Sequence, residues 1–136
     1  MARATDDLMR VPLFAGLSGR QLKKLASAFR ERRFKAGATV MREGSMSGMG
    51  FFVVAEGEAR VSVAGAEVAT LTAGQHFGEL ALISKTERTA TVTARTDIRC
   101  LEIAFADFRS FAHANPDVTW KLLQHVVSIL ERERSR

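Results

Sequence analysis

The residues of this chain best suited to chemistry lie between positions 77 and 92, in the run FGELALISKTERTATV. Gly78 lets the backbone approach a bound group closely, because glycine has no Cβ and tolerates a positive φ. Glu79 begins a stretch able to form one helical turn, whose free N–H groups and dipole favour a phosphate or carboxylate. Arg88 adds a planar set of donors that can hold two phosphate oxygens at once.

Glu79 implies a second kind of contact in the same pocket. A carboxylate accepts hydrogen bonds from hydroxyl groups, which phosphate cannot donate, so the ligand needs both an anion and an alcohol. Sugar phosphates and nucleotides meet that description. The simpler interpretation is a turn at Gly78-Glu79 and a surface ion pair of Arg88 with Glu79 or Glu87, worth about 0–1 kcal/mol. The length and spacing of the run favour the ligand pocket.

The run Phe-Gly-Glu-Leu-Ala-Leu, five residues, Arg-Thr-Ala-Thr-Val resembles the phosphate-binding cassette of the cyclic nucleotide-binding domain family. That family includes catabolite activator protein, the regulatory subunit of protein kinase A and the C-terminal domains of cyclic-nucleotide-gated channels. The resemblance covers nearly the whole chain. It implies a non-catalytic sensor that binds cAMP, with cGMP as the weaker alternative.

The resemblance also assigns roles to individual residues of this cassette. It implies a ribose contact for Glu79 and a phosphate contact for Arg88. The backbone amides of Leu80, Ala81 and Thr89 would complete the phosphate cradle. Thr89 occupies a position where the family often has Ser or Thr beside the phosphate and the purine, which is compatible with either cyclic nucleotide.

The residue that covers the base varies within the family and comes from the last helix. Ser128, Ile129 and Arg132 are therefore the candidates here. The expected ligand-binding set comprises Phe77, Gly78, Glu79, Leu80, Ala81, Arg88, Thr89, Ala90, Ser128 and Arg132.

The length and composition are those of one globular domain. The chain has 136 residues and 46% hydrophobic content, enough for one core, so we expect a single domain over residues 1–136. No apolar run approaches the ~20 residues of a membrane span. The N-terminal residues lack the apolar core of a signal peptide, which predicts a cytoplasmic protein.

The positive charge raises the question of nucleic-acid binding. The net charge is +5, but the basic residues are dispersed among acidic ones, as in Arg30-Glu31-Arg32-Arg33. Alternating signs of this kind are typical of a solvated face. Direct DNA binding is not favoured.

An enzyme is not expected, because catalytic spacings are missing from the sequence. A metal-dependent cupin would need clustered ligands, whereas His76, His113 and His125 are scattered and form no HxH or HExxH motif. There is no GxSxG motif, and Cys100 lies in a strand-like run as a small apolar residue. We therefore predict no metal, no cofactor and no catalytic residue.

The predicted frame begins with an N-terminal helix over residues 12–32. Ser18 and Gln21 form a capping box, and the helix then presents one apolar stripe for packing. The stripe consists of Leu22, Leu25, Ala26 and Phe29.

Residues 33–103 alternate short apolar runs with turn signals. The turns are predicted at Ala36-Gly37, Glu56-Gly57, Ala64-Gly65 and Ala73-Gly74. Many short strands with regular turns indicate a sandwich or jelly roll. The resulting fold class is α+β, an antiparallel β jelly-roll barrel with an N-terminal helix and two C-terminal helices, the hinge and the lid.

Residues 104–136 return to helical periodicity. Asn115-Pro116 should divide two helices, since proline disfavours α geometry in the residue before it. The last helix carries two apolar sets, which indicate either a second contact surface or a deeply buried helix. The sets are Trp120, Leu123, Val127 and Leu130, and Val118, Leu122, Val126 and Ile129.

The output of the expected sensor lies outside these residues. The alternatives are a ligand-binding fragment of a DNA-binding transcription regulator or of a channel. A complete regulator would need a helix-turn-helix after the last helix, for which we expect no room in this chain. We expect an effector domain or protein beyond this chain. A homodimer through the last helix is a further expectation, whereas the nucleotide preference and the effector stay open.

Overall fold

Two antiparallel sheets make up the β part of the fold in the computed structural model, which describes residues 2–42, 50–77 and 90–134. Sheet A has the strand order β1-β8-β3-β6, and sheet B has the order β2-β7-β4-β5. The strands are β1 (Arg30–Phe34), β2 (Thr39–Met41), β3 (Gly50–Glu56), β4 (Ala59–Val63), β5 (Ala66–Leu71), β6 (His76–Phe77), β7 (Thr91–Ala94) and β8 (Ile98–Ala104). The predicted α+β jelly roll is confirmed, but these sheets are not closed into a barrel.

Sheet A buries both of its faces. Its central strands β3 and β8 are buried at every position except their last residues. One face, with Phe52, Val54 and Cys100, packs against sheet B, and the other, with Phe51, Val53 and Leu101, packs against the helices. Strands covered on both sides read as continuous apolar runs, which explains why FFVVA lacks alternation.

The N-terminal segment contains more elements than the predicted helix. It comprises α1 (Ala2–Met9), the 3-10 helix η1 (Pro12–Phe14) and α2 (Gly19–Ala28). The capping box is confirmed: the Gln21 amide donates to Ser18 Oγ at 3.2 Å, and Gln21 Oε1 accepts from the Ser18 amide at 2.9 Å. The prediction of one helix over 12–32 is wrong at both ends, because the chain is already extended at Phe29 and begins β1 at Arg30.

The charged run at Arg30 is a strand with ordered partners. Strand β1 pairs with β8 in antiparallel register, with Arg30 opposite Glu102. The buried Glu102 carboxylate accepts from Arg32 at 2.7 Å and from Arg30 at 3.4 Å. The exposed residues Arg30, Glu31 and Arg33 agree with the predicted solvated face, but the sequence did not indicate that these charges also pair across strands.

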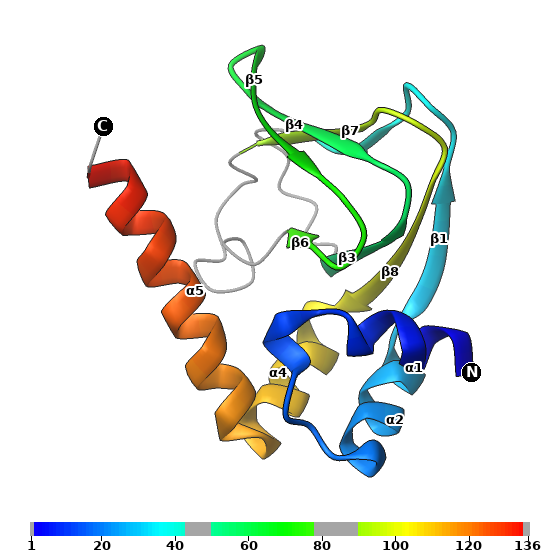
Figure 1. Cartoon of the computed structure of the whole chain (residues 1–136), viewed down its shortest axis with the longest axis vertical. Helices are drawn as coiled ribbons and strands as arrows, with labels where there is room; N and C mark the ends of the chain where they lie inside the picture. The colour runs from blue at the N-terminus through cyan, green and yellow to red at the C-terminus, as the bar shows by residue number, and fades with distance from the viewer. Residues whose placement is uncertain (1, 43–49, 78–89, 135–136) are drawn as a thin grey trace.

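Two helices follow the sheets, as predicted. Helix α4 (Phe105–Ala114) packs against β8 and β3, and α5 (Pro116–Arg134) follows after the single residue Asn115. Figure 1 shows the helices α1, α2 and α4 gathered at one end of the sheets, with α5 running along one side. No helix in the described ranges has both the length and the apolar character needed to cross a bilayer.

Candidate functional site

The predicted anion pocket lies in the connection between β6 and β7. Gly78, Glu79, Leu80, Ala81, Arg88 and Thr89 fall outside the described residues. Phe77 and Ala90, the two ends of the expected set, are described, and so is the backbone of the last helix. The frame around the connection is therefore the part of the site that the structure defines.

The connection starts from the edge of sheet A. Strand β6 pairs with β3, with Phe77 opposite Phe52. The two rings stack with centroids 4.9 Å apart and planes 1° from parallel, and Phe77 is buried. Beside it, the His76 ring lies 5.2 Å from the Phe51 ring. Stacked aromatic rings of this kind stabilise a strand of only two residues beyond its backbone pairing.

The connection ends in the interior of sheet B. Ala90 is half-buried, and β7 then pairs with β4 on one side and β2 on the other. Val92 is buried between the sheets. The segment that carries Glu79 and Arg88 therefore begins at a strand of sheet A and ends at a strand of sheet B.

The last helix exposes one of its two apolar sets. Trp120 is 61% exposed, and Leu123, Val127 and Leu130 are exposed as well. A deeply buried helix is therefore the wrong interpretation for this stripe. Of the other set, Val118 is buried in the core, and the side chains of Leu122, Val126 and Ile129 lie outside the described residues.

The candidates for covering the base lie on the second half of α5. Ser128 is exposed. Arg132 belongs to the same helix, but its side chain lies outside the described residues. The role of either residue toward a ligand stays a prediction.

The hinge between α4 and α5 is tied to the start of α2. Asn115 Oδ1 accepts from Gln21 Nε2 at 2.6 Å, and Asn115 Nδ2 donates to the Phe111 carbonyl at 2.8 Å. Since Gln21 also completes the capping box with Ser18, one amide side chain joins the α2 cap to the hinge. The sequence predicted the cap and the hinge separately but contained no signal that they bond to each other.

The first turns of α5 are anchored to the N-terminal segment at two further points. Lys121 Nζ donates to the Ala15 carbonyl, directly after η1. Val118 is buried in the same core cluster as Leu13 and Phe14 of η1. The base of α5 is therefore fixed, whereas its second half presents apolar residues to solvent.

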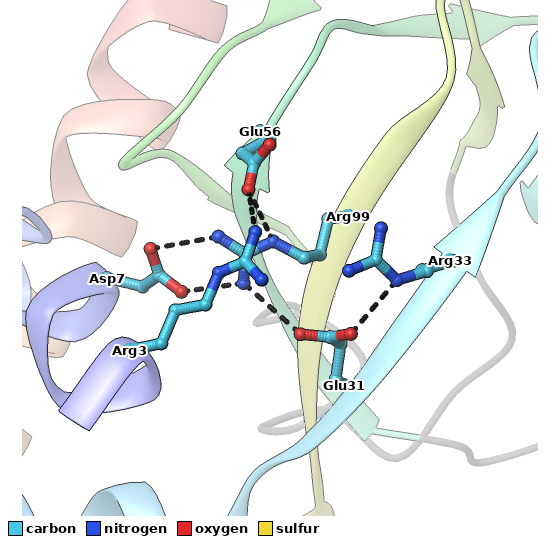
Figure 2. A network of polar contacts seen from close by, with 6 residues as sticks. All are labelled: Arg3, Asp7, Glu31, Arg33, Glu56 and Arg99. Carbon is cyan, nitrogen blue, oxygen red and sulfur yellow. Dashed lines mark hydrogen bonds and ion pairs between the residues drawn. The ribbon is translucent and has the colours of Figure 1, made fainter. Parts of the chain in front are cut away.

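A buried arginine that the sequence analysis did not single out joins α1 to sheet A (Figure 2). Arg99 on β8 donates to both Asp7 oxygens, from Nη1 at 2.8 Å and from Nη2 at 3.3 Å. Its Nε donates to Glu56 at 2.7 Å, and Nη1 lies 3.4 Å from Glu31. The side chains of Arg99 and Asp7 are only 4% and 2% exposed, so the pair is desolvated.

Arg3, Arg33 and Arg99 accompany Asp7, Glu31 and Glu56 in this cluster, so its formal charges balance. The hydrogen bonds that Arg99 donates to Asp7 and to Glu56 raise the pKa of Arg99, although its burial acts in the opposite direction. Hydrogen bonds from Arg99 and Arg3 lower the pKa of Glu56. One signal was present in the sequence: an arginine within a strand expected to be buried requires a carboxylate partner.

Nucleophilic chemistry is not supported at the one cysteine. Cys100 is fully buried, and that burial raises the pKa of its thiol to about 12. The thiolate is the reactive form, so this side chain is inert at neutral pH. Among the described residues, no three His, Cys, Asp or Glu side chains come together in a group that could hold a metal.

Comparisons with known proteins agree with this frame. The pattern of the family described as "Cyclic nucleotide-binding domain" matches residues 31–115. A cyclic nucleotide-gated potassium channel of Rhizobium etli is 38% identical over 109 residues, which cover 79% of this chain and 30% of the channel. The chain spans less than a third of the length of this channel, of a second potassium channel of Mesorhizobium japonicum and of a kinase regulatory subunit of Schizosaccharomyces pombe.

Two solved structures share the fold. The catabolite activator protein of Thermus thermophilus superposes with a TM-score of 0.82 at 26% identity, covering 90% of this chain and 60% of that one. The regulatory domain of Toxoplasma gondii PKA, crystallised with cAMP, gives a TM-score of 0.81 at 28% identity over 93% of this chain and 49% of that one.

The hinge contact predicts a measurable coupling. Gln21→Met and Asn115→Ala each remove the bond between α2 and the hinge, so their effects on the free energy of unfolding should be non-additive by roughly 0.5–3 kcal/mol. Urea unfolding of the two single variants and the double variant measures this term. Lys23→Met, an exposed change on the same helix, is the control and should add to Asn115→Ala within about 0.5 kcal/mol. Additivity of Gln21→Met with Asn115→Ala would show that the bond does not join the two elements.

Proposed function

Because the chain belongs to the cyclic nucleotide-binding domain family, we propose that it binds a cyclic purine nucleotide and acts as a non-catalytic sensor. The proposed ligand is cAMP, with cGMP binding more weakly. The observation that carries the proposal is the cassette sequence of residues 77–92, with its phosphate and hydroxyl partners at the family spacing. A related domain crystallised with cAMP supports the choice of nucleotide.

Each cassette residue has a proposed task. Arg88 holds the cyclic phosphate as a bidentate partner, and the amides of Leu80, Ala81 and Thr89 bind its remaining oxygens. Glu79 accepts from the ribose hydroxyl. Phe77 lies in β6 of sheet A, and Ala90 directly precedes β7 of sheet B. We propose that these two ends of the connection set the width of the pocket.

The second half of α5 is the proposed lid. Its base is anchored through Asn115 and Lys121, so the second half, with Ser128 and Arg132, is the part proposed to close over the purine. A ligand shifts such an equilibrium only by its different affinity for the two positions.

The effector is proposed to lie outside these 136 residues. The matched relatives are much longer than the chain and include channels and kinase regulatory subunits. The chain could therefore be the sensor part of a channel or the ligand-binding part of a transcription regulator, and both stay as alternatives. A cytoplasmic location is part of the proposal. The buried Cys100 supports the non-catalytic assignment.

The exposed stripe of α5 supports a homodimer. Trp120, Leu123, Val127 and Leu130 follow one another at intervals of three, four and three residues, which is the a/d spacing of a coiled coil. With Trp120 at an a position, Val127 is the next a, and the two leucines are d. Valine at a and leucine at d favour a parallel pair of helices, so the proposed partner is a second copy of the chain.

Titration calorimetry tests the proposed ligand directly. We expect heat on adding cAMP to nucleotide-free protein and a weaker affinity for cGMP. The protein should also be stabilised by about 2.7 kcal/mol at a ligand concentration of a hundred times Kd. Absence of binding at millimolar cAMP, with protein shown to be folded, would end the proposal.

Two substitutions separate the phosphate and ribose contacts. Arg88→Ala should weaken cAMP binding by roughly 2–5 kcal/mol, because it leaves a desolvated phosphate unpaired. Lys85→Ala, which removes a positive charge from the same segment, is the control and should change affinity little. Glu79→Ala should abolish the preference for cAMP over 2′-deoxy-cAMP. Equal binding of the two ligands by the parent protein would remove the role of Glu79, and unchanged affinity in Arg88→Ala would remove that of Arg88.

The dimer is tested by one charge placed in the stripe. Sedimentation should show the parent protein as a dimer and Val127→Glu as a monomer, because a carboxylate at an a position is desolvated in the pair. Trp120 is the only tryptophan and there is no tyrosine, so its emission should shift to longer wavelength in the same variant. Val68→Glu, at an equally exposed valine on β5, should stay dimeric. A parent protein that sediments as a monomer contradicts the dimer.

A further inference from the structure

The end of α1 touches the turn from which β6 and the cassette begin. Gly74, in the turn before β6, has φ of +91°, and a Cβ on it would lie 3.2 Å from the Arg10 carbonyl oxygen. The turn is bonded to β3, since the Gly74 amide donates to the Val54 carbonyl and the Val54 amide donates to the Gln75 carbonyl, both at 2.9 Å. Only three residues separate Gly74 from Gly78.

The position of Arg10 depends on Asp7. The Arg10 amide donates to the Asp7 carbonyl at 3.2 Å, at the point where α1 ends. The Asp7 carboxylate in turn is held by both terminal nitrogens of Arg99 (Figure 2). A continuous path of contacts therefore runs from β8 through Asp7 and Arg10 to the Gly74 turn.

We propose that the Asp7–Arg99 pair is a positioning contact for the cassette. It holds α1 in the position at which the Arg10 carbonyl contacts the Gly74 turn. That turn sets the position of β6, the strand that precedes the cassette. Neither Asp7 nor Arg99 touches the ligand in this role. The inference rests on the proposed function for its effect on affinity, but the contact itself is independent of any ligand.

Apolar burial and the Asp7–Arg99 ion pair both hold α1, but only the ion pair fixes its orientation. Leu8 and Val11 are fully buried in the core, and such apolar contacts keep the helix attached without fixing its direction. The two-point pair of Asp7 with Arg99 has a defined geometry and so fixes the register of the helix on sheet A. Loss of the pair should therefore shift α1 rather than detach it, because Leu8 stays buried. Arg99 keeps Glu56 and Glu31 as partners.

The first test needs no nucleotide. Hydrogen exchange of ligand-free protein, resolved by residue with NMR, should be faster at the Gly74 and Val54 amides in Asp7→Asn than in the parent. Amides of β4 and β5 should keep their rates, which shows that the variant is folded. Asp6→Asn, an exposed neighbour on the same helix, should match the parent throughout. Unchanged exchange at Gly74 and Val54 in folded Asp7→Asn would overturn the positioning contact.

The second test measures affinity for cAMP. Asp7→Asn and Gly74→Ala should each raise Kd by about 2- to 30-fold, the range found for residues that influence a site without touching the ligand. Gly37→Ala is the matched control, because Gly37 has nearly the same φ of +90° but nothing within 4 Å of a built Cβ. It carries the same backbone strain without the Arg10 contact, so Kd should stay at the parent value.

The double variant completes the test. Because both changes act on one contact, Asp7→Asn with Gly74→Ala should raise Kd by less than the product of the single effects. Effects that multiply, or an equal loss of affinity in Gly37→Ala, would overturn the inference. A parent protein that binds no cAMP would refute the proposed function instead, and the exchange experiment would still decide whether Asp7 positions the turn.

Discussion

The whole structure depends on sheet A having to bury both of its faces. Strands β3 and β8 are apolar on either side, so one face needs sheet B and the other needs a layer of helices. The helix layer is assembled from both ends of the chain, with α1, η1 and α2 from the N-terminus and α4 and the base of α5 from the C-terminus. Elements remote in sequence are thus packed into one cluster around Phe51 and Phe108.

Burial of the helix-facing side has a consequence for charge. Arg99 lies on that side, where an unpaired guanidinium would be costly, so carboxylates from α1, β1 and β3 surround it. This ties the first helix to the middle of the sheet. The connection that carries the cassette leaves the same sheet at β6 and enters the other at β7.

Much of this frame could be predicted from local sequence. The turns at Gly37, Gly57, Gly65 and Gly74 all have positive φ, as their Gly pairs indicated. The capping box at Ser18 and the break at Asn115 are also local features, and both are confirmed.

The parts that escaped prediction depend on contacts between distant residues. Helix α1 has few apolar residues and is held by Asp7 on an arginine that lies 92 positions away. The sequence of strand β1 predicted the charged end of a helix, because its pairing with β8, which places Arg30 opposite Glu102, is not visible in the local sequence. The Gln21–Asn115 bond likewise joins residues 94 positions apart. For the cassette itself, Glu79 and Arg88 were assigned by spacing and family resemblance, and their roles remain predictions.

The central proposal is that a cyclic nucleotide binds to residues 77–92 and that the second half of α5 then moves toward it. Amide chemical-shift mapping of ¹⁵N-labelled protein during a cAMP titration tests this most directly. The account predicts that the largest shifts fall in residues 77–92 and in the second half of α5, with β4 and β5 little changed. Saturable shifts elsewhere, for example at Arg20, Lys23 and Lys24 of α2, with residues 77–92 unaffected, would contradict it.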